Sequence, residues 1–162
     1  MTKIKQTRSF GNPSASGFKV FDYPFYLMNQ VEYRYYAIMD RIFKEDEISR
    51  PIWRVLLILR NNEHMSVTDI AEHTAIMRPT VSRILERMEK SRLIERRTRS
   101  EDNRITDIYL MSKGKEVIDK AVEDVAKQYE WTVSGLKNAE LKVFNKVLLH
   151  MLENLKGLPW IN

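Results

Sequence analysis

The chain of 162 residues is 43% hydrophobic and carries a net charge of +5, which excludes an intrinsically disordered chain and allows a sizeable core. The basic excess favours an anionic partner, which by charge alone is either a nucleic acid or a membrane surface. The sequence has no cysteine, which excludes disulfides and thiol chemistry and fits a cytoplasmic protein; no apolar run approaches the roughly 18 residues of a membrane span.

Residues 1–20 have the composition of a flexible basic arm. They contain Gly11, Pro13 and Gly17 among serine, threonine, lysine and arginine residues, and the first 21 residues carry a charge of +4 without any acidic side chain. Such an arm could contact DNA phosphates, although a disordered terminus without this role explains the composition equally well.

A long amphipathic helix is expected over residues 21–44. Its apolar residues follow one another at steps of three and four, close to a heptad pattern, which is typical of packing along a partner helix. The members of this row are Phe21, Phe25, Met28, Val31, Tyr35, Ile38 and Ile42. Further aromatic side chains lie outside the row and must face a second surface or a pocket. We assign residues 21–48 to a helical dimerisation region.

Residues 49–111 are predicted to form three helices followed by a hairpin. The first helix is almost wholly apolar. The second starts at Ser66, where Asp69 completes a pattern similar to a capping box. The third covers about residues 77–91, and Pro79 fits its first turn because the missing N–H has no helical partner there.

Two strand-like runs, residues 93–98 and 105–111, enclose a charged loop whose asparagine, aspartate and serine favour a turn. Helix, turn, helix and hairpin in this order indicate a winged helix-turn-helix, which places its second helix in the DNA major groove. Residues 78–104 carry nine basic and five acidic side chains. The positive charge is therefore concentrated where the DNA-reading surface is expected.

Candidate DNA-contacting side chains lie on the polar face of the third helix and in the hairpin loop. Arginine can read guanine edges with two bonds, and serine and threonine can reach bases or phosphates. Arg104 is suited to the minor groove, and Asp102 could hold it by a charge-assisted bond. A solvated helix face and an ordinary surface ion pair are the alternatives. The candidates are Arg78, Pro79, Thr80, Ser82, Arg83, Arg87, Arg99, Asp102 and Arg104.

Two helices are expected after the hairpin, over residues 112–134 and 139–155. They carry more apolar surface than one small reader domain can cover, so we assign residues 112–162 to the dimerisation region. A two-fold dimer would place two reading helices about one DNA turn apart, as a palindromic site requires.

The hairpin resembles the wing of the multiple-antibiotic-resistance regulator (MarR) family. The family pattern DxRxxxxxLTxxG is matched here by Asp102, Arg104, Leu110 and Gly114, and it departs from the sequence at Met111, where the family has threonine before Ser112. Residues 78–83 also look like the recognition helix of that family. The resemblance extends from about residue 22 to the C-terminus. It implies a mostly α fold with a small β wing, in a homodimeric DNA-binding transcriptional regulator that is most often a repressor.

The resemblance also implies a small aromatic acid or phenol as effector, held between the dimer helices and the reader. Arg34 could clamp its carboxylate with two parallel bonds. An aromatic stripe in the core and a surface or interface ion pair are the alternatives. A ligand that prefers the DNA-incompetent spacing of the two readers would release DNA. The candidate ligand-binding residues are Tyr26, Tyr33, Arg34, Tyr36, Met39, Trp53 and His64.

Enzymatic and metal-dependent functions have little support in the sequence. It has no Gly-rich phosphate loop and no HExxH motif, so we expect no catalytic residue, cofactor or metal. His64 and His73 could join Asp69 or Glu72 in a metal-responsive regulator, but the spacing is not that of a closed zinc site. A winged helix can also act as a protein-interaction module without DNA binding. The arginine-rich face argues against this alternative, because interface cores tend to exclude charge.

Overall fold

The computed structural model describes residues 9–45 and 48–157, so part of the expected N-terminal arm and the last five residues lie outside the described residues. The chain divides after Val125 into two compact units, and each is described by itself. No helix in the described ranges is both long and apolar enough to cross a membrane.

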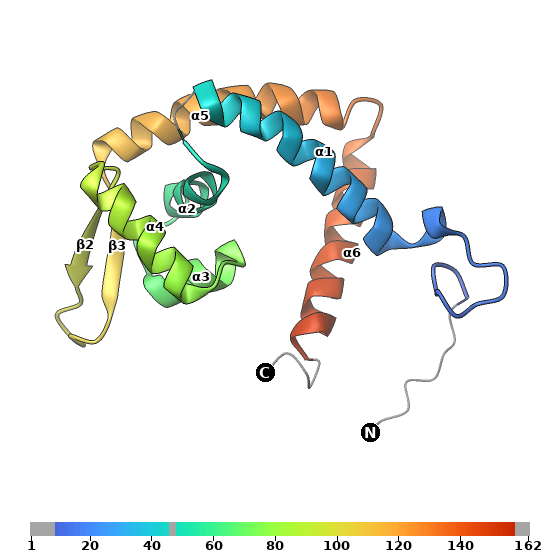
Figure 1. Ribbon diagram of the computed structural model, residues 1–162, viewed down its shortest axis with the longest axis horizontal. Helices are drawn as coiled ribbons and strands as arrows, with labels where there is room; N and C mark the ends of the chain where they lie inside the picture. Colours follow the sequence, from blue (N-terminus) through green and yellow to red (C-terminus); the bar gives the residue numbers. More distant parts are fainter. Residues whose placement is uncertain (1–8, 46–47, 158–162) are drawn as a thin grey trace. The chain divides into compact units, whose positions relative to one another are not determined.

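The first unit contains a winged helix-turn-helix preceded by a long helix, which confirms the predicted fold class of a mostly α protein with a small β wing (Figure 1). In chain order its elements are a 3-10 turn Val20–Asp22, α1 Pro24–Glu45, α2 Arg50–Arg60, β1 Met65–Ser66, α3 Val67–Thr74, α4 Arg78–Lys90, β2 Ile94–Thr98, β3 Thr106–Leu110 and the greater part of α5 Ser112–Thr132. The second unit contains the end of α5 and α6 Asn138–Lys156.

The first helix begins later than predicted. Instead of one helix from Phe21, the chain forms a 3-10 turn that ends at Asp22, and α1 begins at Pro24. Tyr23 between them is extended, with φ −87° and ψ 109°. The proline explains this boundary, because its ring disfavours the helical conformation of the preceding residue while its own fixed φ suits the first turn of a helix.

The start of α3 follows the predicted cap. The Ser66 hydroxyl oxygen accepts a hydrogen bond from the Asp69 backbone N–H at 3.1 Å, and the same hydroxyl donates to the Asp69 carboxylate at 2.8 Å. Ser66 also ends a short strand, β1, that the sequence did not predict. Ser66 therefore joins the start of the helix-turn-helix to the sheet of the wing.

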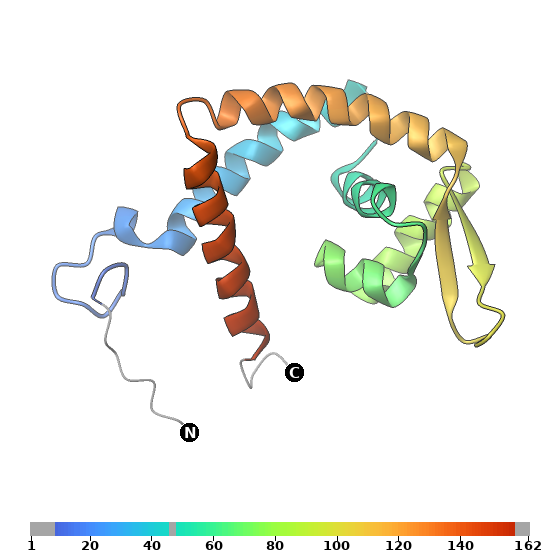
Figure 2. The same cartoon turned by 180° about the vertical axis from the view of Figure 1, so that it is seen from behind.

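The three strands form an antiparallel sheet in the order β1-β3-β2, with β2 and β3 as the hairpin beside α4 (Figure 2). Ile94 pairs with Leu110 and Thr98 with Thr106, while Met65 of β1 pairs with Ile108. One sheet face places Ile94 and Ile108 in the core. The hairpin beyond them extends as the wing.

The core of the first unit is built around the apolar stripe of α4. Val81, Leu85 and Met88 have no exposed side-chain surface, and Ile84 is 9% exposed. They pack with buried residues of α1, α2, α3, the sheet and the first turns of α5. Burying such side chains contributes roughly 1.5–3 kcal/mol each, so the stripe fixes the rotation of α4 about its axis.

Each unit exposes an apolar surface on one of its helices, within the residues that the structure describes. Phe25, Met28 and Val31 of the predicted heptad row lie on the exposed first half of α1. In the second unit, α6 has no buried residue within its described length, although it is strongly apolar. Its exposed hydrophobic side chains are Val143, Phe144, Val147, Leu149, Leu152 and Leu155. Contiguous exposed apolar patches are typical of interaction surfaces.

Gly114 is required by the close approach of α5 to the start of the hairpin. A Cβ atom there would lie 2.2 Å from the Leu93 carbonyl oxygen and 2.7 Å from Leu110 Cδ1. The Leu93 oxygen cannot move freely, because it accepts the Met111 N–H at 3.0 Å.

We predict that Gly114→Ala lowers the free energy of unfolding by about 1–3 kcal/mol in urea denaturation. The control is Gly157→Ala, whose nearest atom would be 3.7 Å away; equal effects of the two changes would contradict the prediction.

Candidate nucleic-acid interface

The polar face of α4 is open to solvent along its whole length. Every candidate on this helix is exposed, namely Arg78, Pro79, Thr80, Ser82, Arg83 and Arg87. Ser82 donates its hydroxyl hydrogen to the Arg78 carbonyl at 3.1 Å, which leaves its oxygen free to accept. Within the described ranges, the Arg78 and Arg83 guanidinium groups form no ion pair. This face presents exposed donors of the kind that read base edges.

A hollow of about 550 Å³ lies between the start of α3, the first turns of α4 and the wing. Its lining includes the four arginines Arg78, Arg96, Arg99 and Arg104 but only one carboxylate, that of Asp69. Asp69 is already bonded to the Ser66 hydroxyl. A concave surface with this charge, beside an exposed reading helix, suits contact with a phosphate backbone.

Arg96 ties the wing to the recognition helix, and sequence reasoning missed it. An η nitrogen of its guanidinium donates to the Ser82 carbonyl at 3.1 Å, and its ε nitrogen lies 3.2 Å from the Glu89 carboxylate. Both partners belong to α4, whereas Arg96 belongs to β2. The alternation of strand side chains places Arg96 on the same sheet face as Ile94, and this signal could have identified it.

Arg99, a predicted DNA contact, forms an ion pair with a buried carboxylate of the wing. Its ε and one η nitrogen donate to the two carboxylate oxygens of Asp107 at 2.9 and 2.7 Å, and the Asp107 side chain is only 5% exposed. A bidentate pair of this geometry holds the end of β2 against β3. The Arg99 guanidinium therefore stabilises the wing, and the part of its side chain that stays exposed lines the hollow.

The wing tip is held through a backbone bond. Asp102 Oδ1 accepts the Arg104 N–H at 3.0 Å, and the Asp102 carbonyl accepts the Ile105 N–H at 2.9 Å. The expected bond from Asp102 to the Arg104 guanidinium is replaced by this turn. The Arg104 side chain is thus exposed at the tip while its backbone is fixed.

The predicted ligand-binding residues occupy five different environments. Met39 and Trp53 are buried in the core, where Trp53 packs against Phe43 with ring centroids 5.4 Å apart. Arg34 is exposed and donates to the Gln30 carbonyl at 3.1 Å and to the Gln30 side-chain oxygen at 2.7 Å. The structure therefore gives Met39 and Trp53 packing contacts and gives Arg34 a partner on its own helix.

Tyr26 and His64 also lie in separate places. Tyr26 contacts Phe21 edge to face at 5.6 Å, near the start of α1. His64 follows α2 and stacks on Tyr109 of β3 at 5.1 Å, with its ε nitrogen 4.0 Å from Asp107. The histidine thus belongs to the base of the wing.

Tyr33 and Tyr36 are brought together at a hollow of about 490 Å³ formed by α1 and the start of α2. The remaining lining residues are Asn29, Glu32, Ala37, Asp40 and Arg50. Arg50 forms a bidentate pair with Asp40, and hydrogen bonding from Arg50 lowers the pKa of that carboxyl group. The Arg50 guanidinium also lies 4.5 Å from the centroid of the Tyr36 ring. Sequence periodicity gave no signal for this arginine, because its partner is on another helix.

Arg54 is a second cation beside the same ring. It donates to the Tyr36 hydroxyl and, at 3.2 Å, to the Thr74 carbonyl at the end of α3. Its guanidinium carbon lies 5.4 Å from the Tyr36 ring centroid. One side chain of α2 therefore links the α1 hollow to the helix-turn-helix.

The alternative metal site is not assembled in the described part of the chain. No group of three or more histidine, aspartate or glutamate side chains suitable for a metal occurs there. His73 Nδ1 lies 2.8 Å from the Asp69 carbonyl oxygen, on its own helix. His64 stacks on the sheet instead of facing His73.

The Arg99–Asp107 pair should make stability depend on pH. Hydrogen bonding from Arg99 lowers the pKa of Asp107 below its ordinary value. The unfolded value is about 3.9, so the pair contributes fully above that pH, and its contribution is lost as pH falls through the lower folded pKa. We expect Asp107→Asn to reduce the free energy of unfolding at pH 7 and the difference from wild type to shrink in acid.

Urea denaturation at pH 7 and at about pH 3 checks this dependence. The matched control is Glu116→Gln, which neutralises an exposed carboxylate of α5 and should change little at either pH. A difference between Asp107→Asn and wild type that stays constant across this range would contradict the assigned role of the pair.

Comparison with known proteins places this geometry in a family. The model of the MarR family matches residues 48–106. The chain is 29% identical to the HTH-type transcriptional repressor IacR of Pseudomonas putida over 154 residues, which are 95% of this chain and 92% of the relative. It is 30% identical to the HTH-type transcriptional regulator MgrA of Staphylococcus aureus over 129 residues, covering 76% of this chain and 83% of the relative.

A solved structure agrees in fold. The crystal structure of NadR in complex with 4-hydroxyphenylacetate superposes with a TM-score of 0.74 at 23% identity, covering 86% of this chain and 97% of NadR. The relatives are transcriptional regulators and not enzymes. The wing signature, the winged helix-turn-helix and these matches together show that the chain belongs to the MarR family of transcriptional regulators.

Proposed function

We propose that this protein is a ligand-responsive repressor that binds a palindromic operator as a homodimer and is released by a small aromatic acid or phenol. The observation that carries the proposal is the exposed polar face of α4 beside a hollow lined by four arginines. DNA offers both surfaces a partner at once, because base edges lie in the groove and phosphates flank it.

A homodimer accounts for the exposed apolar surfaces. The first half of α1 and the face of α6 expose large hydrophobic side chains, each within its own unit. A second copy of the chain could cover the exposed surfaces of α1 and α6. In a two-fold dimer each chain contributes the same surfaces to the interface, so one symmetry operation covers them in both chains. Two copies also supply the two reading helices of a palindromic site.

DNA binding is tested with a duplex selected from a random-sequence pool and titrated by electrophoretic shift at several salt concentrations. We expect a palindromic sequence and about a thousandfold loss of affinity between 50 and 200 mM salt, because several phosphates are neutralised. Sedimentation should show two chains per duplex and a dimer without DNA. A monomer would contradict the proposed homodimer, and the absence of salt-dependent DNA binding would favour a protein-interaction module instead.

Two arginine variants resolve that binding further. Arg83→Ala should cost about 1–3 kcal/mol and relax specificity at one base pair, because an exposed α4 side chain is lost. Arg104→Ala should weaken binding most at A·T-rich flanks, where the minor groove is narrow. Arg41→Ala, an exposed arginine of α1, is the matched control and should bind like wild type.

The hollow on α1 supports an aromatic effector. Two tyrosine rings and the Arg50 guanidinium line it, so a ring can pack there and a carboxylate can replace Asp40 on Arg50. NadR, which has the same fold, was crystallised with 4-hydroxyphenylacetate, a phenol that carries a carboxylate. IacR is described as a repressor. This chemistry is consistent with the effector class that we propose.

Release of DNA would proceed by population shift through Arg54. Arg54 bonds Tyr36 at the hollow and the Thr74 carbonyl at the end of α3. A ligand that moves Tyr36 changes one end of this link, and α3 lies at the other end. Only a difference in ligand affinity between the DNA-competent and DNA-incompetent arrangements can shift their populations.

A thermal-shift panel of benzoates, cinnamates and phenols tests the effector. We expect an aromatic acid to raise the melting temperature of the protein and to release DNA. Arg50→Gln should lower the affinity for carboxylate ligands at least about tenfold and should lower the affinity for neutral phenols less. Arg34→Gln is the matched control, because Arg34 lies on the same helix but does not line the hollow. If no compound of the panel stabilises the protein or releases DNA, the proposed effector class is wrong.

A further inference from the structure

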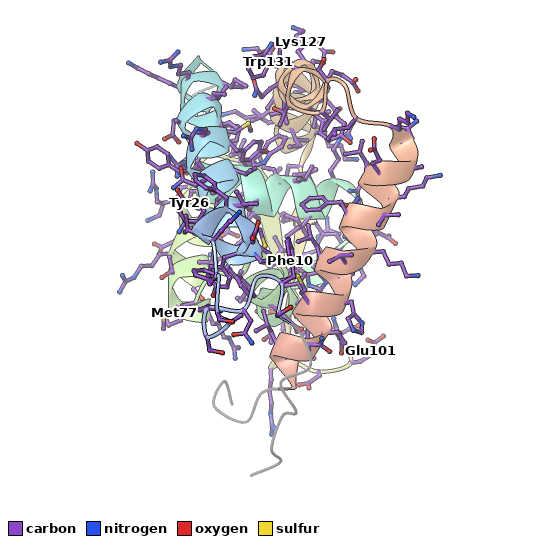
Figure 3. All side chains as sticks on the ribbon, turned by 90° about the vertical axis from the view of Figure 1, so that its right-hand side faces the viewer. Phe10, Tyr26, Met77, Glu101, Lys127 and Trp131 are labelled. Carbon is purple, nitrogen blue, oxygen red and sulfur yellow. The ribbon has the colours of Figure 1, made fainter. Side chains whose placement is uncertain are left out.

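Met77 is the most exposed large hydrophobic side chain among the described residues. It is 78% exposed and lies at the outer edge of the first unit, immediately before α4 (Figure 3). Single exposed apolar residues are ordinary on protein surfaces. This one lies at the start of the helix that presents the reading face.

Helix stability does not explain a methionine at this position. Met77 is the N-cap residue of α4, where serine, threonine, aspartate or asparagine would bond a free N–H of the first turn. Its side chain makes no such bond, and only its carbonyl accepts the Thr80 and Val81 N–H groups at 2.9 and 3.0 Å. The chain thus leaves out a cap and exposes apolar surface at the same residue. Local departures of this kind are expected at functional positions.

The backbone around Met77 is fixed from both sides. Ala75 adopts the left-handed conformation with φ 52°, and the Ile76 N–H bonds the Ala71 carbonyl at 3.2 Å. Pro79 restricts the chain on the other side, in the first turn of α4. The backbone that carries the exposed methionine is therefore restrained, and Arg78 and Thr80, which follow it in the first turn of α4, are exposed as well.

We propose that Met77 is a specificity-determining residue that contacts the 5-methyl group of a thymine in the major groove. This inference depends on the proposed DNA-binding function. The N-terminal residues of a recognition helix contact base edges, and the thymine methyl is the apolar group that a major groove presents. A methionine is flexible and polarisable, so it can cover a methyl group without exact shape matching. Thr80 and Arg83 then read polar edges near it.

The experiment uses the full chain and the selected operator, with each thymine replaced in turn by deoxyuridine, which removes only the methyl group. For wild type, we expect replacement at one position in a half-site to lower the affinity about fourfold, and replacement in both half-sites to lower it about 15-fold. These losses correspond to the burial of one methyl group in each half-site. Met77→Ala changes both copies of the dimer, so its affinity for the thymine operator should be about 15-fold lower than that of wild type. Replacing the two thymines by deoxyuridine should lower the affinity of this variant no further. This non-additivity is the signature of a direct contact.

Two further variants make the result specific. Met77→Leu keeps an apolar side chain and should retain most of the thymine preference. Met111→Ala removes another exposed methionine, located between β3 and α5, and should respond to deoxyuridine like wild type. Met77 is exposed, so thermal unfolding of Met77→Ala should match wild type.

Three outcomes overturn the proposal. If Met77→Ala binds the thymine operator like wild type, or keeps the full deoxyuridine penalty, the methionine does not read the methyl group. If wild type shows no deoxyuridine penalty at any position, no methyl group is read. If wild type binds no duplex at all, the proposed DNA-binding function fails and this inference fails with it. The first two outcomes leave DNA binding intact and so distinguish the two failures.

Discussion

The rotation of α4 about its own axis is the constraint on which the reading surface depends. Its four apolar side chains are almost fully buried, so a turn of one residue, about 100°, would expose part of the stripe and bury an arginine. The polar face is thus in solvent because the opposite face is in the core. Arg96 adds a second restraint, since it bonds the Ser82 carbonyl from the wing and couples the position of the hairpin to the same rotation.

The reader domain was largely predictable from sequence because its signals are local. The 3.6-residue stripe of α4, the Ser66–Asp69 cap and the turn residues of the hairpin each depend on neighbours within a few positions. The two-residue strand β1 was not predictable, since its strand partner, β3, lies about forty residues later in the chain. The start of α1 was missed for another reason. The apolar row continues to Phe21, but Pro24 sets the helix boundary.

The exposure of a site residue was predictable where it depends only on which side of its helix the residue lies. The α4 candidates are exposed as expected, whereas the roles of Arg99, Arg50 and Arg54 depend on partners that only tertiary packing brings near. The aromatic residues of α1 show the same limit. Periodicity identifies a row of rings, but it does not tell which side of the helix meets α2. Met39 therefore lies in the core, whereas Tyr36 and Tyr33, three and six residues before it, line the hollow.

The acidic residues of the reader domain give its positive charge a definite arrangement. Glu89 pairs with Arg96, Asp107 with Arg99, and Asp102 fixes the backbone at Arg104. Each carboxylate thus orders one basic segment of the wing and reduces the repulsion among neighbouring guanidinium groups. Arg78, Arg83 and Arg104 keep side chains without ion pairs in the described ranges. The basic excess of this region is therefore concentrated on side chains that stand on an ordered scaffold, which lowers the conformational entropy lost when they engage an anionic partner.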